Sequence, residues 1–139
     1  MTAPSNDEGR LGDFANAYAA AWCSQEAARV ASFFDELGSL SVNEGAPAVG
    51  RSAIAAVAQG FMTAFPDMQV FCDALRFENG NPVFHWTLVG TNDGPGGSGR
   101  SVRISGYEEW QMGENGLILS SRGHFDSADY ERQTAPIAP

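Results

Sequence analysis

The stretch Ser101–Met112 (SVRISGYEEWQM) decides how the rest of this chain folds. Its side chains alternate with the two-residue period of a β-strand. One face carries apolar residues and one acid: Val102, Ile104, Gly106, Glu108, Trp110 and Met112. The other face carries polar and amphipathic residues: Arg103, Ser105, Tyr107, Glu109 and Gln111. The pattern predicts a strand in a sheet that buries one face, and it places the carboxyl group of Glu108 on the buried side.

The buried position of Glu108 is the first indication of a functional site. An unpaired charge in a protein interior costs roughly several kcal/mol, so such a group is protonated, paired or placed in a cavity. Two other interpretations remain open on the sequence alone. A β-bulge at Gly106 would reverse the phase and turn Tyr107 and Glu109 inward. Alternatively, Glu108 forms a buried structural pair with an arginine.

Length and composition describe a single folded domain. The 139 residues are 43% hydrophobic and 18% charged, which is ordinary for a globular protein with a real core. The net charge of −9 argues against nucleic acid and anionic membranes as partners, because both bind basic surfaces. The first residues lack the regions of a signal peptide, and no run of about 18 apolar residues occurs. With only two isolated cysteines, Cys23 and Cys72, we expect a reducing, cytoplasmic location.

Three helices are predicted ahead of the long strands. After a flexible tail at residues 1–10, the spacing of apolar residues indicates a helix over Leu11–Cys23. Ser24 is a candidate N-cap for a second helix, which ends at Gly38. A third helix follows the loop at residues 45–50 and runs from an N-cap at Ser52 to a stop at Pro66.

A short strand lies between the second and third of these helices. In Ser39–Glu44, the side chains of Leu40, Val42 and Glu44 share one face. A second carboxylate is therefore in phase with apolar neighbours. We expect Glu44 to point into the same interior as Glu108.

Four long strands follow the third helix as a meander. They are predicted at Met68–Phe77, Pro82–Thr91, Ser101–Met112 and Leu117–Phe125, with a hairpin turn at residues 78–82. Asp126 is an N-cap for a last short helix through Gln133, and residues 134–139 form a tail. This order predicts an α+β fold in one domain at residues 11–133, with the helices on one face of a curved antiparallel sheet. Such a sheet leaves an apolar cavity, the usual place for a ligand.

Four short motifs lie along this order of elements. They are Phe65-Pro66-Asp67, Trp86-Thr87 followed by Gly90-Thr91, Gly99-Arg100, and Phe125-Asp126 followed by Gln133. With them the chain resembles the SnoaL-like, polyketide cyclase-like branch of the nuclear transport factor 2-like superfamily over Phe14–Gln133. The resemblance implies a cone-shaped, mostly antiparallel sheet wrapped around the N-terminal helices, the cystatin-like α+β barrel. It also implies a homodimer paired through the outer face of the sheet, which carries Arg103 and Tyr107.

The chain departs from two enzyme patterns of this superfamily and approaches a third. The Asp that polyketide cyclases and epoxide hydrolases place on the last strand falls at Gly123, and the Arg-x-Asp pair of the epoxide hydrolases is absent from the second long strand. The ketosteroid isomerases match better. By similarity, Tyr18 matches their helical Tyr and Glu108 their protonated acid. Glu44 or Asn43 falls at the position of their general base.

Several single residues have a structural alternative. Tyr18 lies on the apolar stripe of its helix, which favours a core tyrosine with a satisfied hydroxyl over a catalytic donor. His85 is expected on the outer face of the sheet, but a reversed phase would place it in the pocket. The family register places His124 outward and Ser121 and Gly123 inward. The histidines and acids show no metal-ligand spacing, so we expect no metal, and the resemblance implies no cofactor.

These observations lead to one functional hypothesis and one alternative. The hypothesis is an enzyme that isomerises, cyclises or dehydrates a small apolar carbonyl-bearing ligand of polycyclic or polyketide-like type. Glu44 would move the proton, while Tyr18 and a neutral Glu108 would hold the developing oxyanion. The pocket is expected to be lined by Trp22, Phe61, Phe65, Trp86 and Trp110. The alternative is a non-catalytic ligand-binding or dimerisation module, which the glycine at position 123 supports.

Overall fold

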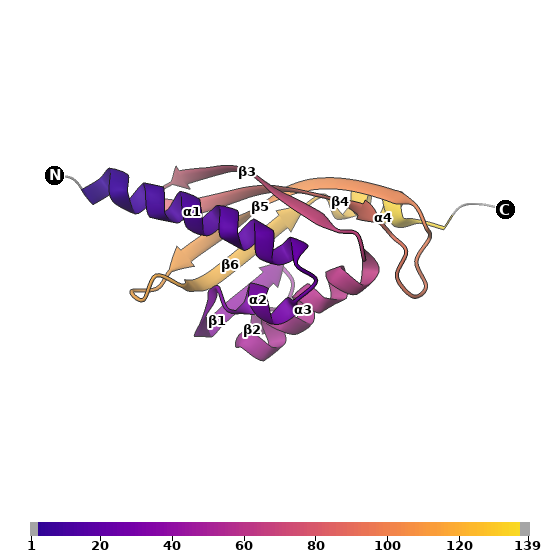
Figure 1. Cartoon of the computed structure of the whole chain (residues 1–139), viewed down its shortest axis with the longest axis horizontal. Helices are drawn as coiled ribbons and strands as arrows, with labels where there is room; N and C mark the ends of the chain where they lie inside the picture. Colours follow the sequence, from indigo (N-terminus) through magenta and orange to yellow (C-terminus); the bar gives the residue numbers. More distant parts are fainter. Residues whose placement is uncertain (1–2, 137–139) are drawn as a thin grey trace.

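The computed structural model describes residues 3–136 and has the expected α+β architecture (Figure 1). Its elements are α1 (Ala3–Cys23), α2 (Ala27–Ala31), β1 (Phe34–Val42), β2 (Ala48–Val49), α3 (Arg51–Ala64), β3 (Gln69–Glu78), β4 (Asn81–Thr91), β5 (Ser101–Met112), β6 (Ile118–Phe125) and α4 (Ser127–Thr134). The four long strands lie where the sequence predicts them, within one residue of the expected bounds. No helix within this part of the chain is long and apolar enough to cross a membrane.

The six strands form one curved sheet in the order β2-β1-β6-β5-β4-β3. Neighbouring strands are antiparallel except β1 and β6, which run parallel. The sheet is open, because β2 and β3 are its two edges. In Figure 1, α1 lies along the sheet, where it packs against β3, while α3 packs against β1 and β2. The helices thus cover the inner face of the sheet, as the resemblance implies.

The core is an aromatic cluster between α1 and the inner face of the sheet. Tyr18, Phe34, Phe84 and Trp110 are at most 1% exposed. The ring of Tyr18 meets the rings of Phe84 and Trp110 edge-on, with centroids 5.3 Å apart in each pair. Phe84 and Trp110 stack at 5.2 Å. Each such pair contributes roughly 0.5–1.5 kcal/mol beyond the hydrophobic energy of its buried area. The cluster therefore stabilises the packing beside Glu108.

The strand β5 keeps one phase along the part that matters for the site. It pairs with β4 without a register shift from Ser101 to Glu109, so the bulge considered at Gly106 is absent. Gly106 is instead required by crowding. A Cβ atom there would lie 2.2 Å from the carbonyl oxygen of His124 and 2.6 Å from the ring of Trp86. The predicted inward direction of Glu108 is confirmed, because this residue is only 7% exposed.

Two of the short motifs prove to be clamps between elements. After α3 ends, the carboxylate of Asp67 accepts bonds from the backbone N–H of Thr91 at 2.7 Å and from its hydroxyl at 2.8 Å. The side chain of Gln133 in α4 accepts from the N–H of Arg103 at 2.7 Å and donates to its carbonyl oxygen at 2.9 Å. Asp126 caps α4 as predicted. The side chains of Asp67, Asp126 and Gln133 therefore support the fold, and none of them lines the cavity.

The region predicted as a second helix is mostly strand. The helix α2 ends at Ala31, and β1 begins at Phe34. The predicted continuation to Gly38 is wrong, because the chain crosses into the sheet with a register shift between β1 and β6 just before Ser39. A Cβ atom at Gly38 would lie 2.9 and 3.0 Å from two backbone carbonyl oxygens. Over so few residues, helical spacing and a distorted strand produce similar apolar patterns.

The helix starts also differ from the predictions. The helix α1 begins at Ala3, so residues 3–10 of the predicted tail are helical, while residues 1–2 and 137–139 of the two tails lie outside the described part. Pro4 is tolerated because a first-turn residue has no intrahelical N–H bond to lose. The N-caps of α2 and α3 are Glu26 and Gly50, in place of Ser24 and Ser52.

Candidate active site

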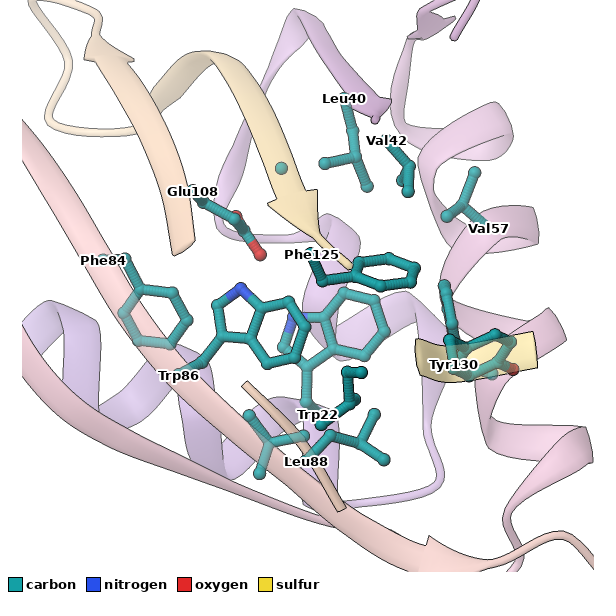
Figure 2. Close-up of a pocket in the computed structure, with 14 residues that line it drawn as sticks. Trp22, Leu40, Val42, Val57, Phe84, Trp86, Leu88, Glu108, Phe125 and Tyr130 are labelled. Atoms are coloured by element: carbon teal, nitrogen blue, oxygen red, sulfur yellow. The ribbon is translucent and has the colours of Figure 1, made fainter. Parts of the chain in front are cut away.

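A cavity of about 60 Å³ lies between the inner face of the sheet and helices α1, α3 and α4 (Figure 2). Six of its lining residues are aromatic: Trp22, Phe61, Phe84, Trp86, Phe125 and Tyr130. The others are aliphatic or small, apart from one acid: Leu40, Val42, Val57, Val70, Leu88, Ile104, Gly123 and Glu108. Among the described residues that line the cavity, Glu108 is therefore the single charged group.

The carboxyl group of Glu108 is held asymmetrically. Its Oε1 atom accepts three hydrogen bonds: from the hydroxyl of Tyr18 at 3.0 Å, from Nε1 of Trp110 at 2.9 Å and from the hydroxyl of Ser121 at 2.8 Å. Its Oε2 atom accepts no bond from the described part of the chain, and Figure 2 shows the carboxyl group directed into the cavity. One oxygen is thus anchored, and the other is free to meet a ligand.

Burial is the largest influence on the pKa of Glu108. Removal from water raises the pKa of this carboxyl above its ordinary value, and the bonds from Trp110, Ser121 and Tyr18 lower it by less. Within residues 3–136, the acid has no ion pair, so the buried pair with an arginine is not formed. The pKa of Tyr18 lies well above its usual value, first through burial and then through the charge of Glu108, so its hydroxyl remains a donor.

The structure brings Tyr18 and Glu108 together, and Tyr18 takes the core place that its position on the apolar stripe favours. Its side chain is fully buried and does not line the cavity. It therefore contacts Glu108 from within the core, which combines the core and functional interpretations of this residue. Ser121 was expected inward but had no assigned part. Its register partner on β5 is Trp110, which brings both donors beside Glu108.

Three of the five predicted pocket residues line the cavity: Trp22, Phe61 and Trp86. Phe65 and Trp110 do not, because they are 0% and 1% exposed within the packed core. Phe125 and Tyr130 were missed, although the inward phase of β6 indicates Phe125. Tyr130 packs edge-on against both Phe61 and Phe125, which closes the cavity from the side of α4.

Glu44 does not join this site. The strand β1 ends at Val42, and Asn43 and Glu44 both adopt a left-handed backbone, with φ of 50° and 65°. The alternation that predicted an inward Glu44 therefore stops two residues before it, and the exposed side chain of Glu44 lines a separate, open groove. Asn43 has a structural role, because its Oδ1 accepts the backbone N–H of Phe125 at 2.8 Å.

The two histidines lie on the outer face of the sheet, as expected. His85 and His124 flank Tyr107, with ring centroids 5.8 and 4.8 Å from its ring. His124 also contacts Oε1 of Glu109 at 3.0 Å. Within the described residues, no group of three or more His, Cys, Asp and Glu is arranged to hold a metal ion.

Gly123, where the resemblance places an Asp, lies directly opposite the acid. It is the register partner of Glu108 across β5 and β6. A Cβ atom at Gly123 would lie 3.7 Å from Cγ of Glu108, which is ordinary contact. In this chain the carboxyl group of Glu108 on β5 therefore lies beside the position on β6 where the resemblance places the Asp.

The fold agrees with the comparisons to known proteins. The family model of the SnoaL-like polyketide cyclases matches residues 12–134, so the chain belongs to this family. A search of curated proteins found no match.

Solved structures share the fold at low sequence identity. A protein from Catenulispora acidiphila with a ketosteroid isomerase-like fold, solved with trimethylamine, has a TM-score of 0.76 at 15% identity, covering 91% of this chain and 97% of that one. A protein from Jannaschia sp., provisionally assigned as a SnoaL-like polyketide cyclase, has a TM-score of 0.75 at 18% identity, covering 99% of each chain. SalBIII, an epoxide hydrolase/cyclase-like enzyme studied for pyran ring formation in salinomycin, has a TM-score of 0.74 at 17% identity, covering 88% and 95%.

Proposed function

We propose that this protein is a cofactor-independent acid–base enzyme in which Glu108 exchanges a proton with a small apolar substrate that bears a carbonyl or hydroxyl group. The reaction class is isomerisation, cyclisation or dehydration. One observation carries the proposal: the acid has three donors on Oε1 and a free Oε2 in an apolar cavity. The ring-forming role of SalBIII in a related fold supports the choice of reaction class.

The arrangement suits a group that gives and takes back one proton. Because burial raises the pKa of Glu108, the carboxyl retains its proton at a higher pH than an exposed acid. The three donors occupy Oε1, so the proton resides on Oε2, where a substrate oxygen can accept it. After transfer, the same donors stabilise the carboxylate, and Oε2 can remove a proton from a substrate carbon.

The size of the cavity limits the substrate. A volume of about 60 Å³ is far below the roughly 300 Å³ or more of a drug-sized ligand site. We therefore propose a small, single-ring or open-chain compound in place of a polycyclic one. Glu44 is not part of this proposal, because it is exposed and lines a different groove.

Exchange of carbon-bound protons tests the proposal without a known substrate. We expect the protein to accelerate deuterium uptake next to the carbonyl of cyclopentanone in heavy water, followed by NMR. Glu108→Gln should lose about 100-fold or more of the acceleration, in the range of general acid–base catalysis. Glu109→Gln, altered on the outer face of the same strand, should retain it.

The binding-module alternative predicts a different outcome. Its support is the apolar lining of the cavity, which suits a ligand whether or not it reacts. Cyclopentanone that binds the wild-type protein and exchanges no faster than in buffer would favour this alternative over the enzyme.

We also propose a homodimer paired through the outer face of the sheet. Phe71 and Tyr107 leave large side chains 49% and 38% exposed on this face. Beside them, Nε2 of His85 is buried and has no partner within the described residues. Light scattering at micromolar concentration should give the mass of a dimer, and a monomer mass would contradict this proposal.

A further inference from the structure

The cavity offers aromatic carbon surfaces where an oxyanion site would offer hydrogen-bond donors. We infer that it stabilises a positively charged intermediate, a carbocation or a protonated carbonyl that forms when Glu108 protonates the substrate. Its substrate class is then small apolar alcohols and ketones that react through a cation. This inference rests on the proposed function and adds that the intermediate of the reaction is positively charged.

The donors needed for a negative intermediate are already used. An enolate requires N–H or O–H groups about 2.7–3.1 Å from its oxygen. The hydroxyls of Tyr18 and Ser121 and the indole N–H of Trp110 all bond to Glu108, and none of these residues lines the cavity. Three donors belong to the lining residues themselves: Nε1 of Trp22 and Nε1 of Trp86 are buried, and the hydroxyl of Tyr130 points away from Glu108. Among the described residues, no accessible donor therefore faces the acid, apart from its own proton.

The aromatic lining presents carbon to the cavity. Nε1 of Trp22 and Nε1 of Trp86 are buried, so the accessible atoms of these two rings are carbons. In Figure 2, the ring of Trp86 lies beside Glu108 with its nitrogen on the side of the acid, and the ring of Trp22 lies next to that of Trp86. The hydroxyl oxygen of Tyr130 points away from Glu108. The face of an aromatic ring carries partial negative charge and attracts a cation within about 6 Å of its centre.

Charge complementarity favours the same intermediate. No arginine or histidine lines the cavity among the described residues, and the chain contains no lysine. Once Glu108 has given up its proton, its carboxylate is the single charge beside the substrate. A cation is therefore attracted both by the rings and by the carboxylate, whereas an anion would be repelled by both.

Each reaction of this kind balances with Glu108 alone. With an alcohol, the proton moves from Oε2 to the hydroxyl oxygen, the C–O bond breaks and water leaves a carbocation against the rings. The carboxylate then removes a proton from the adjacent carbon, an alkene forms and the carboxyl group is restored. With a ketone, protonation of the carbonyl oxygen and loss of an α-proton to Oε2 give the enol.

A matched pair of ligands tests the inference. Choline and 3,3-dimethylbutan-1-ol have the same shape and differ in one atom, a charged nitrogen in place of a carbon. We expect choline to bind the wild-type protein about tenfold more tightly at pH 7, since a single cation–π contact is worth roughly two- to thirty-fold. Dissociation constants can be measured by ligand-observed NMR or by calorimetry.

Variants separate the rings from the carboxylate. Trp86→Leu and Phe61→Leu keep Glu108 and should each reduce the preference for choline, while Phe71→Leu on the outer face should leave it unchanged. The thermal melting of each variant shows that it is folded. Equal binding of the two ligands, no binding of choline, or a preference retained in both inner variants would overturn the inference.

The outcome is independent of the test of the proposed function. If the protein exchanges cyclopentanone protons but does not prefer choline, the proposed acid–base activity stands and the cationic intermediate is refuted. If the protein prefers choline through its aromatic rings but exchanges no protons, the cavity binds cations and the proposed acid–base activity is refuted.

Discussion

Glu108 and Glu109 are neighbours on β5, yet the sheet places them in opposite surroundings. Glu108 is 7% exposed, lies among aromatic rings and accepts bonds from three neutral donors. The side chain of Glu109 is 38% exposed and lies 3.0 Å from His124 and 3.5 Å from Arg122. The same chemical group is thus a buried acid with a raised pKa on one face and half of a surface ion pair on the other.

The two acids contribute very differently to the free energy of unfolding. A surface ion pair is worth about 0–1 kcal/mol, because water screens it and its long side chains lose freedom. A buried carboxyl group with three dedicated donors cannot be removed without leaving those donors unpaired. Four experiments test the difference between the two acids.

The largest effect is expected from removing each acid in turn. Glu108→Ala leaves the hydroxyls of Tyr18 and Ser121 and the indole N–H of Trp110 unpaired. It should lower the free energy of unfolding by about 3 kcal/mol. Glu109→Ala should cost less than about 1 kcal/mol. Urea denaturation measures both values, and similar losses in the two variants would contradict the comparison.

The next effect concerns crowding beside Glu108. Gly106→Ala forces a Cβ atom to within 2.2 Å of the carbonyl oxygen of His124 and should cost about 2 kcal/mol or more. Gly123→Ala, on the strand paired with it, meets its nearest atoms at 3.5 and 3.7 Å and should cost less than about 1 kcal/mol. Thermal melting ranks the pair, and an unstable Gly123→Ala beside a stable Gly106→Ala would refute the described packing.

A smaller effect is the pH dependence of stability. Because the pKa of Glu108 is raised above the ordinary value of 4.5, the folded protein binds an extra proton between that value and the raised pKa. Its free energy of unfolding should therefore fall as pH rises through this interval, by at most about 1.4 kcal/mol per pH unit, and then level off. Denaturant titrations of wild type, Glu108→Gln and Glu109→Gln measure it. The slope should disappear in Glu108→Gln alone.

The smallest effect is a change in the pKa of Glu108. Ser121→Ala removes a donor that stabilises the carboxylate, so the pKa of Glu108 should rise further. Ser120→Ala, one residue earlier on the other face of β6, should leave it unchanged. Carbon-13 NMR of labelled glutamate reports the titration directly. A lower pKa in Ser121→Ala would show that this hydroxyl does not donate to Glu108.

Alternation along β5 was sufficient to predict the buried acid, and Ile104 and Trp110 on the same face are buried as expected. The turn at Asn79 and Gly80 was equally readable, because both residues adopt the left-handed backbone that such a hairpin needs. The same reasoning failed at Glu44. There β1 ends at Val42, and the two-residue alternation of a strand does not predict the direction of side chains beyond its last residue.

The four long strands, the inward phase of Glu108 and the family could be predicted from the sequence alone, because local periodicity and short motifs are properties of neighbouring residues. Only the tertiary structure decided that Tyr18, Trp110 and Ser121 meet one oxygen of Glu108. Those contacts span 90, 2 and 13 residues. They depend on how α1 docks and on the register of β5 with β6, which are set by the packing of the whole core and by no single segment.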